Sequence, residues 1–166
     1  LVELQHARLD AGFAHVAHAP EGLAQLLVSS QPFVACVPAA HALARRRALP
    51  LTALAGEPLA LVSRSVSPDY HARIVGACQA AGFTPQPLHE LQHWLSVVSL
   101  VAQGLAVALV PAALRQAALS GAAFVPVKDP HGALPRYETR CLWSRERDLP
   151  ALGLFLAQVR EVAQAG

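Results

Sequence analysis

The stretch that most constrains the fold is residues 95–116, LSVVSLVAQGLAVALVPAALRQ, which contains no acidic side chain. Apolar residues at positions 95–102 recur at helical spacing, and Gly104 follows where a helix is expected to end. Residues 105–110 form an apolar run of strand length, and Pro111 suits the first turn of another helix. Because a strand without a polar face must be covered on both sides, this stretch predicts a parallel sheet in an α/β fold.

The rest of the chain also alternates short strands with helices, which is typical of α/β proteins. Predicted strands lie at residues 11–17, 23–30, 32–37, 58–62, 88–91, 124–127 and 136–144. Predicted helices lie at residues 1–9, 51–54, 68–81 and 149–165. Ser67 is a favourable N-cap, Pro68 a favourable first helical residue, and Gly82 a favourable residue after the helix end. Residues 129–132, Asp-Pro-His-Gly, predict a turn or a crossover loop.

Composition narrows the class of protein. The 166 residues can bury a real core, as one domain or as two small lobes. No apolar run approaches the roughly 18 residues that a membrane span needs, and no signal-peptide pattern opens the chain. The net charge is +2, and the one tight basic cluster lies at residues 45–47. This is weak evidence for a surface that binds nucleic acid. Cys36, Cys78 and Cys141 are widely spaced, so we expect buried thiols in a reducing compartment, and no metal or other cofactor.

His89, Glu90 and His93 match the H-E-x-x-H pattern of zinc metalloproteases. That chemistry needs both histidines one turn apart on a single helix. Two prolines just upstream of His89 leave little room for such a helix, so a strand followed by a helix start is the preferred interpretation. Residues 94–128 contain no acidic side chain for a third ligand. With no G-x-S-x-G, G-x-G-x-x-G or P-loop present either, the sequence does not predict an enzyme.

The loop at residues 64–70, RSVSPDY, is the more informative feature. It follows a buried strand and opens a helix, as loops do at the ligand-facing end of an open α/β sheet. Free N–H groups and the helix dipole there favour an anionic group, with Tyr70 packing against its apolar body. The charge of Asp69 opposes a carboxylate, and a simple capped helix is the alternative. Trp94 either faces the same cleft or packs in the core.

Four segments, in this order and spacing, resemble the effector-binding domain of LysR-type transcriptional regulators. They are residues 7–13 (ARLDAGF), 37–44 (VPAAHALA), 80–85 (AAGFTP) and 100–111 (LVAQGLAVALVP). The D-A-G-F sequence and the S-P-D-Y loop are most similar to the branch of the family that senses aromatic acids and their ring-cleavage products.

The resemblance implies a periplasmic-binding-protein-like fold of type II with two Rossmann-like lobes. Lobe I comprises residues 1–30 with 136–166 and is incomplete, and lobe II comprises residues 31–135. The effector lies between them in the family. By the same resemblance, the lining residues are Phe13 and His15 from lobe I and Ser67, Pro68 and Tyr70 from lobe II, with Trp94 as a further candidate. His15 stands where this branch often has arginine, which makes a charge partner for a carboxylate dependent on pH.

The family also implies partners. We expect a small carboxylate or aromatic-acid-like effector, DNA bound through an N-terminal domain outside these residues, a homodimer or homotetramer, and a cytoplasmic, non-membrane protein. We expect the chain to be a fragment that also lacks the first strand and helix of the effector domain, leaving a sheet edge in lobe I uncovered. The alternatives are a solute-binding protein of a transporter and, more weakly, a zinc hydrolase.

Overall fold

The computed structural model of the protein describes residues 2–6, 8–85, 87–117, 119–128, 132, 134–146 and 149–165. Its contacts divide the chain into two compact units, here called unit 1 (residues 1–30 and 136–166) and unit 2 (residues 31–135). The turn expected at residues 129–132 lies outside the described residues except for Gly132. None of the helices in the described part of the chain is long and apolar enough to cross a bilayer.

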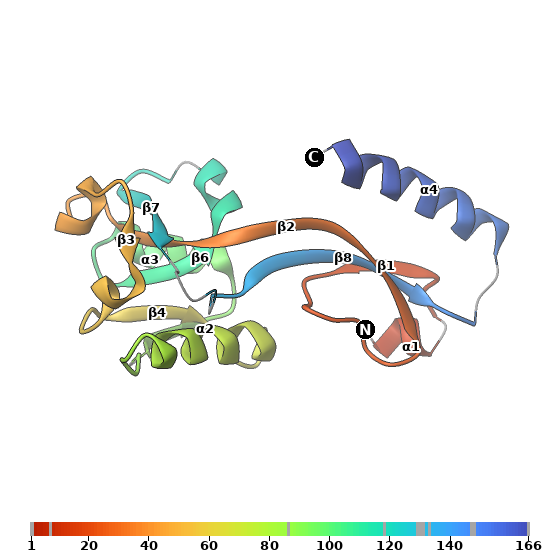
Figure 1. The fold of residues 1–166 in the computed structure, drawn as a ribbon, viewed down its shortest axis with the longest axis horizontal. Helices are drawn as coiled ribbons and strands as arrows, with labels where there is room; N and C mark the ends of the chain where they lie inside the picture. The colour runs from red at the N-terminus through yellow and green to blue at the C-terminus, as the bar shows by residue number, and fades with distance from the viewer. Residues whose placement is uncertain are drawn as a thin grey trace. The chain divides into compact units, whose positions relative to one another are not determined.

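Unit 1 is built on a small sheet with the strand order β1-β8-β2 (Figure 1). Its elements are α1 (Val2–Gln5), β1 (Ala11–Ala14), the first part of β2 (Leu23–Pro38), β8 (Arg136–Ser144) and α4 (Pro150–Ala165). Adjacent residues of a strand point to opposite faces of its sheet. Cys141 accordingly packs with Leu152, Leu156 and Val159 of α4, whereas Leu142 packs with Leu4 of α1 and Leu23. Each face of this sheet therefore has its own small apolar cluster.

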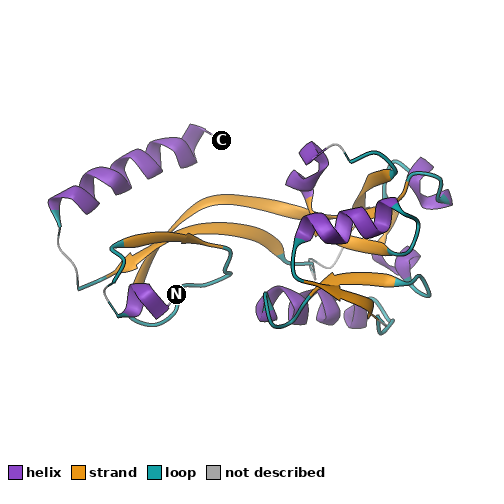
Figure 2. Cartoon of the chain, turned by 180° about the vertical axis from the view of Figure 1, so that it is seen from behind, coloured by secondary structure: helices purple, strands orange, loops and turns teal. Residues whose placement is uncertain are grey.

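Unit 2 holds the larger sheet. Its strands are the second part of β2, β3 (Leu49–Pro50), β4 (Leu59–Val62), β5 (Pro87–Leu91), β6 (Val107–Pro111) and β7 (Ala122–Lys128). Its helices are α2 (Pro68–Ala80), α3 (Trp94–Ala102) and short 3-10 helices at Ala42–Arg45, Leu51–Leu54 and Ala112–Ala117. Figure 2 shows α2 and α3 on opposite sides of the strands. The buried valines of α3 pack on apolar residues of β2, β4 and β6.

The prediction from the acid-free stretch is confirmed in its main points. Every residue of β6 is buried, and β6 pairs in parallel with β4, which pairs in parallel with β5. The other neighbour of β6 is β2, which runs antiparallel to it, so the sheet is mixed. Gly104, two residues after the end of α3, has a φ of +78°, a conformation that favours glycine.

Several predicted boundaries were wrong; the strand expected at residues 11–17, for example, ends at Ala14. Residues 23–30 and 32–37 form one strand, because the fixed φ of Pro32 is compatible with an extended backbone. Pro111 is the last residue of β6, paired with Phe33, and the next helix is a 3-10 helix that begins at Ala112. The helix expected over residues 1–9 covers only Val2–Gln5, since the N–H groups of Arg8 and Leu9 both return to the carbonyl of Glu3.

The three cysteines are free and buried, as predicted. Burial raises the pKa of Cys36 to about 12 and the pKa of Cys78 to about 11, and it also raises the pKa of Cys141. A thiol with a raised pKa is a poor nucleophile, because the thiolate is the reactive form. The cysteines therefore serve as small apolar core residues.

Candidate functional site

The H-E-x-x-H match does not form a helical metal site. His89 and Glu90 lie in strand β5, and His93 is the residue before α3, so the two histidines do not share one helix face. Glu90 Oε1 instead lies 3.2 Å from His71 Nε2, which links β5 to α2. The interpretation as a strand followed by a helix start is confirmed. Within the described residues, no three His, Cys, Asp or Glu side chains are placed to hold a metal ion.

The loop after β4 is folded around Ser63. The Ser63 N–H donates to the carbonyl of Leu91 at 2.7 Å, which ties the loop to the end of β5. The Ser63 carbonyl accepts from the N–H groups of Val66 and Ser67, both at 3.0 Å. Its hydroxyl oxygen accepts from the Ser65 N–H at 3.2 Å. These bonds set the point at which α2 begins, at the carboxyl end of β4, where ligands bind in open α/β sheets.

Ser67 occupies the predicted N-cap position of α2, but its side chain makes no capping hydrogen bond. Its ψ of 71° departs from the extended conformation that is usual for a cap residue. The predicted N-cap position is therefore confirmed, but without the side-chain hydrogen bond that such a residue usually makes. Pro68 is the exposed first residue of the helix. The Asp69 carboxylate lies 3.0 Å from Arg73 Nε one turn later, which partly neutralises the charge that opposes an anion here.

An aromatic cluster joins three elements of unit 2. Phe33 of β2 has its ring centroid 6.0 Å from that of Tyr70 in α2 and 5.9 Å from that of Trp94 in α3. Tyr70 is buried, and Trp94 is partly buried against the core cluster of α3. The structure thus brings two predicted site residues onto a common neighbour. Sequence reasoning missed Phe33, although an aromatic residue within a buried strand was a usable signal.

The two predicted residues of unit 1 lie in and just after β1. Phe13 is exposed and contacts Phe155 of α4 edge to face, with centroids 6.2 Å apart. His15 stacks on Tyr137 of β8 at 4.5 Å, with an angle of 26° between the rings. Its Nδ1 lies 3.2 Å from the hydroxyl oxygen of Thr139. Sequence reasoning missed both residues of β8, because strand register between distant segments is not visible in sequence.

The electrostatics around His15 favour its neutral form. Partial burial lowers the pKa of His15, and a backbone hydrogen bond with Glu138 opposes that effect more weakly. A neutral imidazole offers a hydrogen bond to a carboxylate but no charge. His15 is therefore a weak charge partner for a carboxylate at neutral pH, unless a bound anion raises its pKa and restores the proton.

Arg140 holds the segment in which His15 lies. Its Nε donates to the carbonyl of Val16 at 3.2 Å, and its Nη1 donates to Gln25 Oε1 at 3.2 Å. Its Nη2 forms an ion pair with Glu138. The same Gln25 oxygen accepts from the N–H of Ala19 at 2.9 Å. The loop between β1 and β2 is thereby tied to β8 and β2 by polar contacts.

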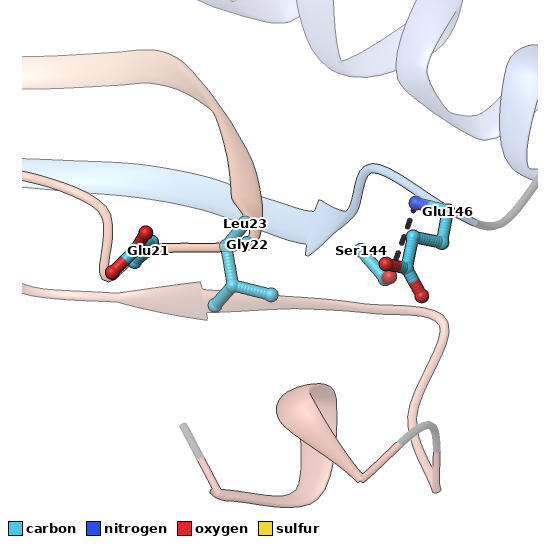
Figure 3. Close-up of a pocket in the computed structure, with 5 residues that line it drawn as sticks. All are labelled: Glu21, Gly22, Leu23, Ser144 and Glu146. Atoms are coloured by element: carbon cyan, nitrogen blue, oxygen red, sulfur yellow. Dashed lines mark hydrogen bonds between the residues drawn. The ribbon is translucent and has the colours of Figure 1, made fainter.

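Unit 1 also has an open pocket of about 240 Å³ lined by Glu21, Gly22, Leu23, Ser144 and Glu146. Figure 3 shows these side chains, with the Glu146 N–H donating to the Ser144 hydroxyl oxygen at 3.3 Å. None of the predicted site residues lines it. Two carboxylates and one hydroxyl bonded to backbone do not form a nucleophile with its base, so this pocket suggests no catalytic chemistry.

The chain matches a known protein family and is similar to curated transcriptional regulators. A family model described as the LysR substrate binding domain matches residues 1–164. The HTH-type transcriptional regulator IlvR of Caulobacter vibrioides is 36% identical over 146 residues, which are 88% of this chain and 47% of IlvR. The chain spans about half the length of the curated relatives it matches. These relatives are transcriptional regulators. They therefore support neither the alternative of a solute-binding protein of a transporter nor that of a zinc hydrolase.

Solved structures show the same fold. The BenM effector binding domain with its effector benzoate has a TM-score of 0.83 and 20% identity, covering 99% of this chain and 73% of that one. CbnR, a LysR family transcriptional regulator, has a TM-score of 0.81 and 19% identity, covering 98% of this chain and 55% of CbnR. The predicted α/β fold of the periplasmic-binding-protein type is confirmed.

Proposed function

The chain belongs to the LysR substrate binding domain family, and we propose that it senses a small carboxylate or aromatic acid for a transcriptional regulator. The family match over residues 1–164 is the observation that carries this proposal. The fold that the chain shares with the benzoate-bound BenM domain supports the chemical class of the effector. Units 1 and 2 are, in this proposal, the two lobes of the effector-binding domain.

We propose that the effector contacts Ser67 and Pro68 at the start of α2 and Trp94 at the start of α3. Tyr70, which the sequence predicts as a lining residue, is buried against Phe33 and would support this site from behind. The position of these residues after β4 and β5 supports this assignment, since ligands bind beyond the carboxyl ends of parallel strands. The partly positive N-terminus of α2 favours a carboxylate. From unit 1, Phe13 would supply apolar surface and His15 a hydrogen-bond donor to the same effector.

Regulation follows from differential binding. An effector that binds one arrangement of the lobes more tightly than another shifts the population toward it. If this arrangement is coupled to a DNA-binding domain elsewhere in the polypeptide, effector binding changes the affinity for DNA. DNA binding then changes the affinity for the effector by the same coupling free energy. DNA as a partner, assembly into dimers or tetramers, and a cytoplasmic location belong to this proposal.

The test is a thermal-shift and calorimetric titration of the complete regulator with benzoate and with small dicarboxylic acids. At an effector concentration of about 100 times Kd, binding adds about 2.7 kcal/mol of stability, which corresponds to a rise in Tm of roughly 5–10 °C. A complete absence of shifts and of binding heats across both sets of acids would contradict the proposed effector class.

Ser67→Ala is an informative variant, since the Ser67 hydroxyl makes no capping bond whose loss would lower stability. We expect it to keep the Tm of the free protein and to weaken effector binding by about 1 kcal/mol, or fivefold. Ser120→Ala, at an exposed turn before β7, is the matched control and should change neither quantity. If both variants bind the effector with equal affinity, the placement of Ser67 in the proposed site is contradicted.

A further inference from the structure

The side chain of Glu90 leaves the larger sheet on the side of α2. Glu90 is opposite Leu61 in the pairing of β5 with β4. The next pair along the two strands, Leu91 and Val62, packs in the core cluster of α3. Because neighbouring residues of a strand point to opposite faces, Glu90 faces the other side of the sheet, where α2 lies (Figure 2). Its Oε1 accordingly lies 3.2 Å from His71 Nε2 of α2.

The carboxyl end of β5 connects the starts of two helices. Strand β5 is at the end of the strand order, next to β4, and a strand in that position has one neighbour to hold it. The Leu91 carbonyl accepts from the N–H of Ser63 at 2.7 Å, at the beginning of the loop that leads into α2. Helix α3 begins at Trp94, shortly after β5 ends. A contact between Glu90 and α2 therefore bears on the placement of both helix starts.

His71 is one turn beyond the start of α2. Its N–H donates to the carbonyl of Ser67 at 3.0 Å, the hydrogen bond that closes the first turn. The side chain of His71 is 14% exposed, and that of Glu90 is 42% exposed. A pair as exposed as this contributes little to the stability of the whole protein. Its main effect is geometric, because it joins the first turn of α2 to the segment that leads into α3.

On the basis of the proposed function, we infer that Glu90 and His71 are a positioning pair for the effector site. Their contact fixes the start of α2, with Ser67 and Pro68, relative to the start of α3, with Trp94. A site that is held in its binding geometry before the ligand arrives loses less conformational entropy on binding. Neither member of the pair touches the effector; both act by supporting the residues that do.

A second His–Glu pair in unit 2 is a matched control. His41 Nε2 lies 3.4 Å from Glu57 Oε1, and the two side chains are 27% and 32% exposed. Glu57 precedes β4, at the amino end of the parallel strands β4 and β5, whereas Glu90 is near the carboxyl end of β5. The chemistry and the exposure are similar, but the control pair is at the end of these strands away from the proposed site.

The first test is a calorimetric titration of the complete regulator with benzoate and with small dicarboxylic acids. Glu90→Ala should weaken binding about five- to tenfold and lower the Tm by less than about 3 °C. Glu90→Gln keeps an acceptor oxygen for His71 and should bind within about twofold of wild type. Adding His71→Ala to Glu90→Ala should cause no further loss, because the two side chains act as one unit. Glu57→Ala should leave the affinity unchanged.

The second test is hydrogen exchange of the regulator without an effector. Glu90→Ala should speed exchange of the hydrogen-bonded amides of Val66, Ser67 and His71 at least about threefold relative to Glu57→Ala. This comparison does not depend on which acid is bound, or on whether any acid is bound.

Three results would overturn the positioning role. They are equal affinities of Glu90→Ala and wild type, equal losses in Glu90→Ala and Glu90→Gln, and equal exchange in Glu90→Ala and Glu57→Ala. If the wild-type regulator binds neither set of acids, the proposed effector class is contradicted. The exchange comparison then decides by itself whether the pair fixes the start of α2.

Discussion

The two units differ in how they bury apolar surface. In unit 2, every residue of β4 and β6 is buried. In unit 1, only Cys141 and Leu142 of β8 are fully buried, and the helix beside it leaves Leu154 74% exposed. Unit 2 is therefore stabilised by apolar packing within the chain. Unit 1 depends more on polar contacts such as those of Arg140.

The largest expected effect breaks the core of unit 2. Leu109→Ala removes a side chain that is fully buried in β6 and leaves a cavity there. We expect a loss of about 3 kcal/mol of unfolding free energy, measured by urea denaturation. Leu154→Ala in unit 1 is the control and should cost less than about 0.5 kcal/mol. A similar cost for both would show that Leu154 is covered in solution.

A smaller effect compares two glycines in left-handed conformations. Gly121 of unit 2 has a φ of +91°, and a Cβ atom there would lie 2.7 Å from the carbonyl oxygen of Ala102. Gly22 of unit 1 has a φ of +81° and open space around it. Alanine at position 22 should cost about 1 kcal/mol, and alanine at position 121 about 2 kcal/mol or more, because strain and overlap combine. Thermal unfolding of the two variants checks the ranking.

Arg140→Met tests the polar ties of unit 1. The change removes the hydrogen bonds to Val16 and Gln25 and the ion pair with Glu138. We expect a loss of about 1–2 kcal/mol and faster hydrogen exchange between residues 15 and 19. Arg160→Met, at an exposed site on α4, should change neither. Unchanged exchange in the Arg140 variant would mean that the loop is held by other contacts.

The smallest effect is the pH dependence that His15 contributes. Because its pKa is lowered in the folded state, the unfolded chain binds more protons at this site as the pH falls below about 6.5. The folded state therefore loses stability as the pH falls through that window and regains it as the pH rises. Comparing wild type with His15→Gln by urea denaturation from pH 5 to pH 8 isolates this contribution. A wild-type slope no steeper than that of the variant would contradict it.

Local signals in the sequence predicted many elements well. Strand β8 and the 3-10 helix Leu51–Leu54 have the predicted bounds, and α2 ends one residue before the predicted position. Gly82 follows α2 with a φ of +90°, as its position after the helix predicted. These features depend on periodicity, caps and glycine conformation, all of which act within a few residues.

Features of the candidate site were harder to predict, because their partners are distant in sequence. The apparent break at Pro32 is overridden by pairing of β2 with β6 and β7. Ser67 is at the N-cap position, as predicted, but its hydroxyl makes no capping bond. The hydrogen bonds to Ser63 fix the backbone conformation of the loop and with it the orientation of Ser67. The site residues themselves, from Phe13 to Trp94, stay predictions.

The sequence by itself determined the α/β class, the buried character of residues 107–110 within the predicted strand 105–110, and the preference for a strand over a helix at His89 and Glu90. Only the tertiary structure decided that β6 runs parallel to β4 but antiparallel to β2. It also decided that Phe33 lies between Tyr70 and Trp94, and that His15 stacks on Tyr137. The physical reason is that the spacing of apolar residues shows which face of an element is buried. Which residues cover that face depends on strand pairing and register between segments that are distant in the sequence.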